Sequence, residues 1–239
     1  MVSTMKIVCF ICARGGSKGF PNKNITNLQD KPLIAWSIEQ AKSISVVEEV
    51  VISTDCKEIA SVAVEYGANV HFMRPPHLST DESGKWEVWQ HALNEYENIS
   101  NNKVDIFLDL DCTSPLRLTS DIYNAIDLYQ ASDVDAVFSI CEAKKNPYFN
   151  MVEYNEGILK LSKKLDTNIV RRQDAPKVYE HAASIYLLSP NFLRNGSGLL
   201  SGNAIGYEMP YERCIDIDSK FDYELVDLLM RSKNEERNV

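Results

Sequence analysis

Alternating strand and helix patterns constrain the fold of this chain more than any other feature. Up to about residue 140, short runs rich in β-branched and large apolar residues are separated by segments with apolar residues at helical spacing. The strand-like runs are residues 6–12, 49–53, 69–72, 105–110 and 136–140. The helix-like segments are residues 32–43, 57–66, 85–96 and 120–130. We therefore expect an α/β fold with a single Rossmann-like, mostly parallel sheet and right-handed crossovers.

The alternation stops after residue 141. A hairpin pattern around Asn155, Glu156 and Gly157 is followed by a polar, basic stretch that reaches Tyr179. Strand-like residues 184–188 and an amphipathic helix at 221–232 then resume the core pattern, and we expect the tail from residue 233 to fray. We therefore expect one domain, 1–239, with 142–182 as an inserted arm. Because long irregular insertions are usually functional, we expect this arm to have a role in function.

Composition and charge narrow the classes of function. The chain has 239 residues, 44% of them hydrophobic, which is enough for one sizeable core. Its net charge of −9 argues against a nucleic-acid partner, since binding to phosphate backbones needs a basic surface. No apolar stretch approaches the ~20 residues that span a bilayer, and six cysteines, mostly in strand-like runs, suit a reducing compartment. The sequence predicts a cytoplasmic protein without a membrane partner.

A glycine-rich, basic loop follows the first strand-like run. Three glycines between residues 15 and 19 permit tight turns and close approach of backbone N–H groups to a ligand. Arg14, Lys18 and Lys23 add positive charge where a polyanion would lie. The loop contains neither GxGxxG nor the P-loop motif, which disfavours hydride transfer and P-loop hydrolysis. Since ligands bind beyond the carboxyl ends of strands in such sheets, we predict a nucleoside triphosphate site rather than a solvated loop.

Two carboxylates precede the last helix. Asp216 and Asp218 alternate along an extended segment, so both lie on one face. Mg²⁺ usually takes one or two carboxylates together with phosphate oxygens of the substrate. The alternative is that Asp218 caps the helix and Asp216 is solvated. A triphosphate loop elsewhere in the chain favours the magnesium site.

A second acidic pair supports a rival function. Asp109 and Asp111 end the fourth strand-like run in a DxD pattern, which is found in metal-binding glycosyltransferases. Such an enzyme would consume a nucleotide sugar rather than make one.

Several ordered motifs cover almost the whole chain. They are the loop at 13–24, KPLIA at 31–35, VISTD at 51–55, RP at 74–75, TSPLR at 113–117, RRQ at 171–173, SIY at 184–186 and DID at 216–218, followed by Asp222. Together they resemble the acylneuraminate cytidylyltransferases. The segments DLD at 109–111 and NPYFN at 146–150 look most like the branch of that family that activates legionaminic acid.

The resemblance implies that CTP is coupled to a nine-carbon nonulosonic acid, such as legionaminic acid or another relative of sialic acid. The anomeric hydroxyl would attack the α-phosphorus of CTP and release pyrophosphate, with Mg²⁺ as the cofactor. The residues it implies for CTP are Ala13, Arg14, Gly16, Ser17, Lys18, Lys23, Asn24 and Arg74. The residues it implies for catalysis are Arg14, Lys23 and the metal ligands Asp216 and Asp218. A non-catalytic CTP-binding module is the remaining alternative, although these four intact residues argue against it.

On the sugar side, the resemblance implies contacts from eight residues: Asp111, Tyr148, Phe149, Arg172, Gln173, Tyr186, Leu199 and Leu200. Arg172 falls where the family uses an arginine against the acceptor carboxylate. Its alternatives are a salt bridge to Asp174 or a solvated arm, and Tyr186 is equally typical of core packing.

Departures from the sialic acid pattern gather in this pocket. Asp111 and Phe149 stand where relatives specific for sialic acid carry glutamine and lysine, and Leu199 and Leu200 replace a phenylalanine pair. These changes suit a less polar acid such as diacetyllegionaminate. In the resembling family the arm extends across a dimer and helps complete the neighbouring active site, so a homodimer is expected.

Overall fold

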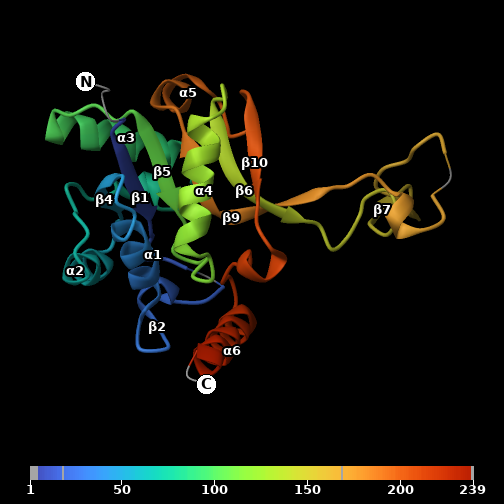
Figure 1. Cartoon of the computed structure of the whole chain (residues 1–239), viewed down its shortest axis with the longest axis horizontal. Coiled ribbons are helices and arrows are strands. Elements are labelled where there is room, and N and C mark those ends of the chain that lie inside the picture. The colour runs from blue at the N-terminus through green and yellow to red at the C-terminus, as the bar shows by residue number, and fades with distance from the viewer. Residues whose placement is uncertain (1–4, 18, 168, 238–239) are drawn as a thin grey trace.

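A six-stranded sheet forms the centre of the computed structural model, which describes residues 5–17, 19–167 and 169–237, without the side chains of 233–237 (Figure 1). Its strand order is β10-β6-β9-β5-β1-β4. The strands are β1 (Ile7–Cys12), β4 (Val47–Ser53), β5 (Ile106–Leu110), β6 (Ala136–Glu142), β9 (Tyr179–Leu188) and β10 (Ala204–Glu208). Strand β9 is antiparallel to β5 and β6, and the other neighbouring pairs are parallel. The expected α/β, mostly parallel architecture is therefore confirmed.

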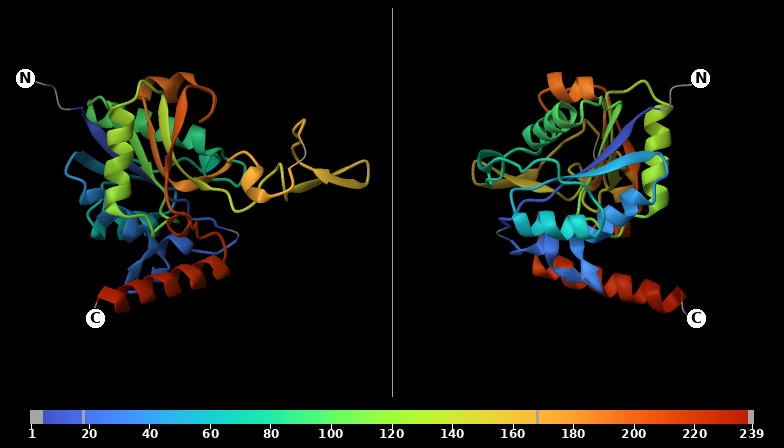
Figure 2. Two further views of the ribbon diagram at one scale, coloured as in Figure 1. Left: turned by 45° about the vertical axis from the view of Figure 1, so that its right-hand side comes forward. Right: turned by 90° about the vertical axis from the view of Figure 1, so that its left-hand side faces the viewer.

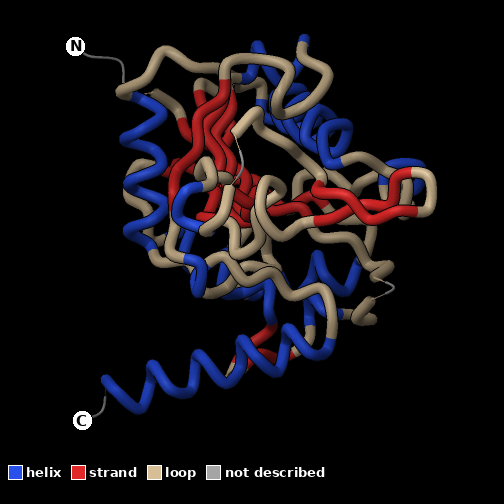
Figure 3. The backbone as a smooth tube through the Cα atoms, turned by 90° about the vertical axis from the view of Figure 1, so that its right-hand side faces the viewer, coloured by secondary structure: helices blue, strands red, loops and turns tan. Residues whose placement is uncertain are grey.

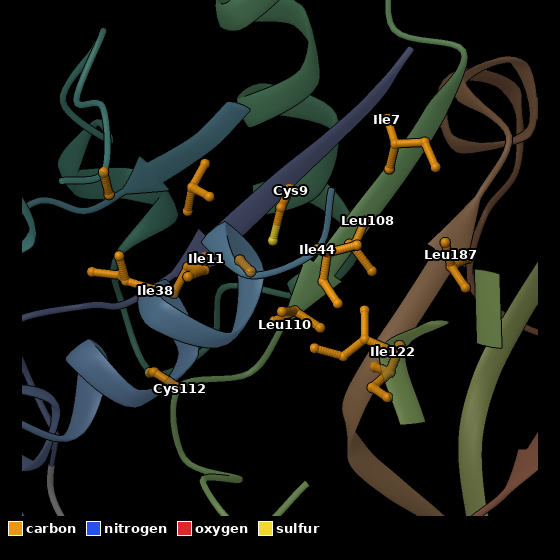
Figure 4. Close-up of a cluster of buried hydrophobic side chains, with 14 of the residues drawn as sticks. Ile7, Cys9, Ile11, Ile38, Ile44, Leu108, Leu110, Cys112, Ile122 and Leu187 are labelled. Carbon is orange, nitrogen blue, oxygen red and sulfur yellow. The ribbon is translucent and has the colours of Figure 1, made fainter. Parts of the chain in front are cut away.

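Helices cover both faces of this sheet because successive residues of a strand point to opposite sides. Ile7, Cys9 and Ile11 of β1 pack with apolar residues of α1 (Leu33–Lys42), α2 (Lys57–Glu65) and α4 (Thr119–Gln130) (Figure 4). Val8 and Phe10 share a second cluster with residues of α3 (Lys85–Ser100) and α5 (Pro190–Asn195). The strands consequently run between two helical layers (Figure 3). No helix in the described ranges combines the length and apolarity needed to cross a bilayer.

A third, smaller apolar cluster attaches the last helix, α6 (Lys220–Arg237), outside the main sheet (Figure 2). Val226 and Met230 of α6 join Leu28 and Leu33, which belong to the ribbon of β2 (Asn27–Leu28) and β3 (Lys31–Pro32) and to the start of α1. Ile217, fully buried, belongs to the same cluster. The segment that carries the two aspartates is thereby held in place by α6.

The arm projects away from the sheet, as Figure 1 shows. Its base is the pairing of β6 with β9, and its far end is the antiparallel hairpin of β7 (Val152–Asn155) and β8 (Ile158–Leu161). Glu156 and Gly157, with φ of 52° and 78°, make the turn, so the predicted hairpin is confirmed. Single turns of 3-10 helix lie at Lys23–Ile25, Pro76–Leu78, Arg172–Asp174 and Tyr211–Arg213.

Several local predictions are wrong. Residues 69–72 form no strand: Asn69 makes a single parallel bridge to Val51, and the chain then turns so that the N–H of Arg74 donates to the carbonyl of Thr54 (2.7 Å). The last helix does not fray at 233 but continues to Arg237, while 238–239 lie outside the described residues. Strand β9 begins at Tyr179 rather than 184, because its exposed first residues pair with β6 at the base of the arm. Strand β10 and helix α5 were not predicted.

Candidate active site

The glycine-rich loop lies beyond the carboxyl ends of β1 and β4. The N–H of Ala13 donates to the carbonyl of Ser53 (3.0 Å), and the N–H of Gly15 donates to Oδ1 of Asp55 (2.9 Å). A Cβ on Gly15 would lie 2.9 Å from Cβ of Cys56, so the residue must be glycine for the loop to pass this closely. The loop is therefore fixed against β4 through its own backbone.

The remaining loop residues differ in exposure. Gly16 is exposed, and Ser17 is half-buried. Lys18, a predicted CTP contact, lies outside the described residues. Contact of Gly16 and Ser17 with CTP stays a prediction.

Arg14 and Asn24 connect the loop to its surroundings. Arg14 donates from a guanidinium nitrogen to the carbonyl of Thr80 (2.8 Å), and the same nitrogen is 2.9 Å from a carboxylate oxygen of Asp81. The side-chain amide of Asn24 donates to the carbonyl of Arg14 (3.0 Å), and its oxygen accepts from the thiol of Cys112 (3.1 Å). Asn24 is buried and holds the loop in shape, whereas its direct contact with CTP stays a prediction.

The loop and the aspartate segment meet, although they are 195 residues apart in sequence. Nζ of Lys23 donates to the carbonyl of Ile217 (2.8 Å) and to Oδ1 of Asp218 (2.9 Å). A Cβ on Gly19 would lie 2.6 Å from the carbonyl oxygen of Asp218, closer than side-chain carbons approach backbone atoms. Two motifs that the sequence singled out separately thus lie in direct contact.

Asp216 has an unusual environment within this site. One carboxylate oxygen, Oδ1, is buried and has no hydrogen-bond partner among the described residues. Burial, together with the charges of Asp218 and Asp111, raises the pKa of Asp216 to about 6, against the opposing effects of a hydrogen bond from Thr113 and the charge of Lys23. The buried, unpartnered oxygen is the kind of atom that a hard cation satisfies.

Asp218, in contrast, is available to a ligand. Its side chain is 75% exposed, and it does not cap α6. Ser219 and Asp222 cap that helix reciprocally: the N–H of Ser219 donates to Asp222 (2.8 Å), and the N–H of Asp222 donates to Oγ of Ser219 (3.3 Å). The helix-cap alternative for Asp218 is therefore not what the structure has.

The donor set fits Mg²⁺ if the substrate supplies further ligands. Within the described ranges no group of three or more His, Cys, Asp or Glu side chains could hold a metal ion. Asp216 and Asp218 provide two carboxylates, and Mg²⁺ commonly binds to such a pair together with phosphate oxygens. The magnesium site stays a prediction.

Arg74 lies near the end of β4, buried to 6% exposure. Its guanidinium donates to Oγ (3.1 Å) and to the carbonyl (2.5 Å) of Ser53. These bonds direct the charge toward the same edge of the sheet as the glycine-rich loop, and its contact with CTP stays a prediction.

Lys85, the first residue of α3, was not among the residues predicted from the sequence. Its Nζ is 3.2 Å from Oδ2 of Asp109, contacts Oδ2 of Asp111, and lies 4.1 Å from the centroid of the Tyr186 ring. Burial lowers the pKa of the Lys85 ammonium, but Asp109 and Asp111 outweigh this effect and hold it well above its ordinary value. Because a lysine at a helix N-terminus is electrostatically unfavourable, this position in the sequence could have marked Lys85 as a candidate functional residue.

Part of the predicted sugar set lies near this cluster. Tyr186 is buried opposite Asp109 in the pairing of β5 with β9. Leu199 and Leu200 line a cavity of ≈ 490 Å³ together with His181. His181 also lines the neighbouring cavity of ≈ 480 Å³ that contains Asp216. Burial, aided by the charge of Lys85, lowers the pKa of His181.

The other predicted sugar residues lie on the arm. Arg172 and Gln173 line a cavity of ≈ 360 Å³, and Tyr148 lines another of ≈ 290 Å³. Phe149 is half-buried, and its N–H donates to the carbonyl of Asn146 (3.0 Å). Neither arm cavity shares a lining residue with the cavity of Asp216, although the cavity of Arg172 borders on it through the adjacent residues Cys141 and Glu142.

Arg172 is not engaged in the salt bridge considered from the sequence. Arg171 pairs with Asp174 through two bonds (2.9 and 2.8 Å). Arg172 donates only one bond that the structure describes, to the carbonyl of Ala143 (3.2 Å), and it is exposed. Its guanidinium can therefore still receive a carboxylate, as the sequence predicts.

A basic glycine-rich loop facing an aspartate pair at the edge of an α/β sheet is an arrangement that suits a nucleotidyltransferase. Residues 8–233 match the family model described as "Cytidylyltransferase". The chain is 39% identical over 229 residues to the CMP-N,N'-diacetyllegionaminic acid synthase of Campylobacter jejuni, covering 96% of this chain and 97% of that protein. The chain belongs to the acylneuraminate cytidylyltransferase family, and the predicted family and enzyme class are confirmed.

Other relatives agree. The chain is 38% identical over 229 residues to the post-translational flagellin modification protein B of Campylobacter coli, covering 96% of this chain and 97% of that protein. It is 31% identical over 221 residues to the N-acylneuraminate cytidylyltransferase of Streptococcus agalactiae, where the match covers 92% of this chain but 52% of the relative. Among solved structures, a CMP:2-keto-3-deoxy-manno-octonic acid synthetase complexed with CTP matches with a TM-score of 0.68 at 17% identity, over 95% of this chain and 99% of the other. At that identity the match shows the fold alone. Family membership favours transfer from CTP over the glycosyltransferase alternative.

Proposed function

We propose that this cytidylyltransferase couples CTP to a nine-carbon nonulosonic acid and that N,N'-diacetyllegionaminic acid is its preferred acceptor. The products are the CMP-sugar and pyrophosphate. The observation that carries the proposal is the meeting of the glycine-rich loop with the aspartate pair, through Lys23 and Asp218. The relatives at 38% and 39% identity, one of them a CMP-N,N'-diacetyllegionaminic acid synthase, support the choice of acceptor.

In this proposal the basic loop binds the triphosphate and the aspartates carry Mg²⁺. Arg14, Lys23 and the backbone N–H groups of the loop neutralise and orient the phosphates, while Arg74 faces the nucleotide. Mg²⁺, held by Asp216 and Asp218, supplies further charge neutralisation when it is bound. The reaction then depends mainly on positioning, since phosphoryl-type transfer leaves the protein little covalent chemistry.

The acceptor site is proposed to combine both halves of the sugar set. Asp111, Tyr186, Leu199 and Leu200 would form its permanent wall, and Arg172 would pair with the sugar carboxylate. Since Leu199 and Leu200 present apolar surface beside His181, this wall suits a sugar acid with acetamido and deoxy groups better than one with a fully hydroxylated tail.

We also propose that the chain, as one catalytic domain, works as a homodimer in which the arm of one protomer reaches the site of the other. The arm exposes a row of apolar side chains on its hairpin, which an aqueous surface does not favour. They are Met151, Val152, Tyr154, Ile158 and Leu159.

Mixing two inactive variants tests the arm. Arg172→Ala damages the arm and Asp216→Asn damages the core, so each homodimer is inactive. If the arm acts on the partner, random exchange of subunits restores about a quarter of the sites, because half of the dimers then contain one intact site. Absence of recovery, or a monomer by light scattering, would refute the proposed arrangement.

Pyrophosphate release tests the function itself. Purified protein is given CTP, Mg²⁺ and one acid from a panel of diacetyllegionaminate, N-acetylneuraminate and 3-deoxy-manno-octulosonate. We expect release with diacetyllegionaminate and only when both substrates are present. A clear preference for N-acetylneuraminate would refute the proposed acceptor. If CTP shifts the melting temperature but no acid gives pyrophosphate release, the protein is a CTP-binding module rather than an enzyme for these acids.

A further inference from the structure

Lys85 is fixed by an unusually complete set of contacts for a lysine that is not fully buried. Its side chain is 34% exposed, yet its ammonium meets the fully buried carboxylate of Asp109 and the carboxylate of Asp111, which is 14% exposed. The same ammonium lies over the rings of Tyr186 (4.1 Å) and Trp89 (5.0 Å). The chain thus holds one point charge in place from β5, β9 and α3.

This arrangement carries an energetic cost that local structure does not explain. A positive charge in the first turn opposes the helix dipole, and a carboxylate buried in the middle of a sheet loses its hydration. Asp109 is on the same face of β5 as Phe107, where an apolar residue would continue the second core cluster. Positions that break local rules without local benefit are typical of functional sites.

The backbone of Asp111 is held just as firmly. Its N–H donates to the carbonyl of Ser184 (3.0 Å), and its carbonyl accepts from Ser37 (3.0 Å) and from the buried Arg117 (2.8 Å). Lys85 fixes the one part that these bonds leave free, the side-chain carboxylate. Asp111 directly follows the carboxyl end of β5, which is parallel to β1, so it lies at the same edge of the sheet as the glycine-rich loop.

We propose that Lys85 is a positioning residue of the acceptor site, which fixes the Asp111 carboxylate as a hydrogen-bond acceptor for an N–H or O–H group of the sugar acid. Asp109 cannot touch the acid, since it is fully buried, and it acts only by anchoring Lys85. This inference rests on the proposed function, because it assigns a role toward the same acceptor.

A double-mutant cycle tests the role. Lys85→Met keeps the length of the side chain and removes its charge, and Asp111→Asn removes the charge that it positions. We expect each variant to raise KM for diacetyllegionaminate by about 10-fold to 100-fold, the range for a lost hydrogen bond to a charged group, with KM for CTP changed by less than about threefold. Because Lys85 acts through Asp111, the double variant should be no worse than Asp111→Asn alone. Lys85→Arg should recover part of the loss.

Lys103→Met is the matched control. Lys103 also pairs with a largely buried carboxylate, that of Glu97 (2.8 Å), but it lies beyond the other end of α3. Lys103→Met should change the melting temperature without changing KM for the acid. In case Lys85→Met is unstable, Lys85→Met with Asp109→Asn removes both charges of this pair together. The raised KM for the acid should persist after stability recovers.

The outcomes separate the two proposals. A wild-type protein that neither converts nor, by calorimetry, binds any acid in the panel refutes both. A wild-type protein that converts diacetyllegionaminate, with KM for the acid unchanged in Lys85→Met, refutes only the role of Lys85. Equal rises in KM for CTP and acid, or costs of Lys85→Met and Asp111→Asn that multiply, also refute it.

Discussion

Replacing Gly19 by alanine should disable the site while leaving the fold intact. The added Cβ would lie 2.6 Å from the carbonyl oxygen of Asp218, whereas ordinary contacts begin at 3.4 Å. The obstacle is backbone on both sides, so the loop and the aspartate segment must separate by about 0.8 Å, the difference between those distances. The same movement stretches the bonds from Lys23 to Ile217 and Asp218.

The expected magnitude follows from that displacement. Misplacement of reacting groups by about 1 Å can lower a rate about 100-fold, so kcat/KM for CTP should fall by about that factor. The free energy of unfolding should fall by only about 1–3 kcal/mol, as for other overpacked sites. Pyrophosphate release and thermal unfolding, measured on the same preparation, provide the two quantities.

Gly206→Ala is the steric control. Its Cβ would meet the side chain of Ile140 at 2.2 Å, but on β10, with no loop residue of the site involved. This variant should lose stability and keep its KM for CTP. If Gly19→Ala folds and turns over CTP like the wild type, the close approach of loop and aspartate segment is not required and the reasoning fails.

Three further predictions concern charge and acceptor choice. Because burial raises the pKa of Asp216 to about 6, the folded protein binds that proton more tightly than the unfolded chain, and this group lowers stability as pH rises through about 4 to 6. Asp216→Asn should therefore raise the free energy of unfolding by about 1–3 kcal/mol at about pH 7.5, with little gain at about pH 4.5. Urea titrations at both pH values check the sign. The same variant should abolish pyrophosphate release, because it removes a proposed ligand of Mg²⁺. Arg172→Lys should raise KM for the acid about 10-fold, since an ammonium cannot pair with a carboxylate bidentately, and an unchanged KM would remove Arg172 from the acceptor site. Asp111→Gln with Phe149→Lys should shift the ratio of kcat/KM values toward N-acetylneuraminate, and competition between the two acids measures that ratio.

Sequence patterns located the parts of the site that are local in the chain. The glycine-rich loop could be placed after β1 because a buried strand and a run of glycines are both visible in sequence. The common face expected for Asp216 and Asp218 stays a prediction, since their segment forms no strand and Asp218 is much more exposed than Asp216. Asn69 shows the limit of this approach, because one backbone bridge and the apolar residues Val70 and Phe72 do not make a strand when the chain must turn away to Arg74.

Lys85 illustrates what could not be predicted from local patterns. Its role depends on β9 inserting antiparallel beside β5, which brings Tyr186 opposite Asp109 and leaves room for a cation. A lysine that opens an amphipathic helix is otherwise typical of a solvated surface. Likewise, the contact between Lys23 and Asp218 is set by α6 and not by either motif.

The attachment of α6 separates the packing that drives folding from the packing that positions the two aspartates. Its apolar cluster is distinct from the two clusters that pack the sheet, and Ile217, between the two aspartates, belongs to it. A chain shortened before α6 would keep most of the buried surface that drives folding but would release the end of the segment that carries the aspartates. The C-terminal helix therefore fixes Ile217, and with it the aspartates on either side, from outside the sheet.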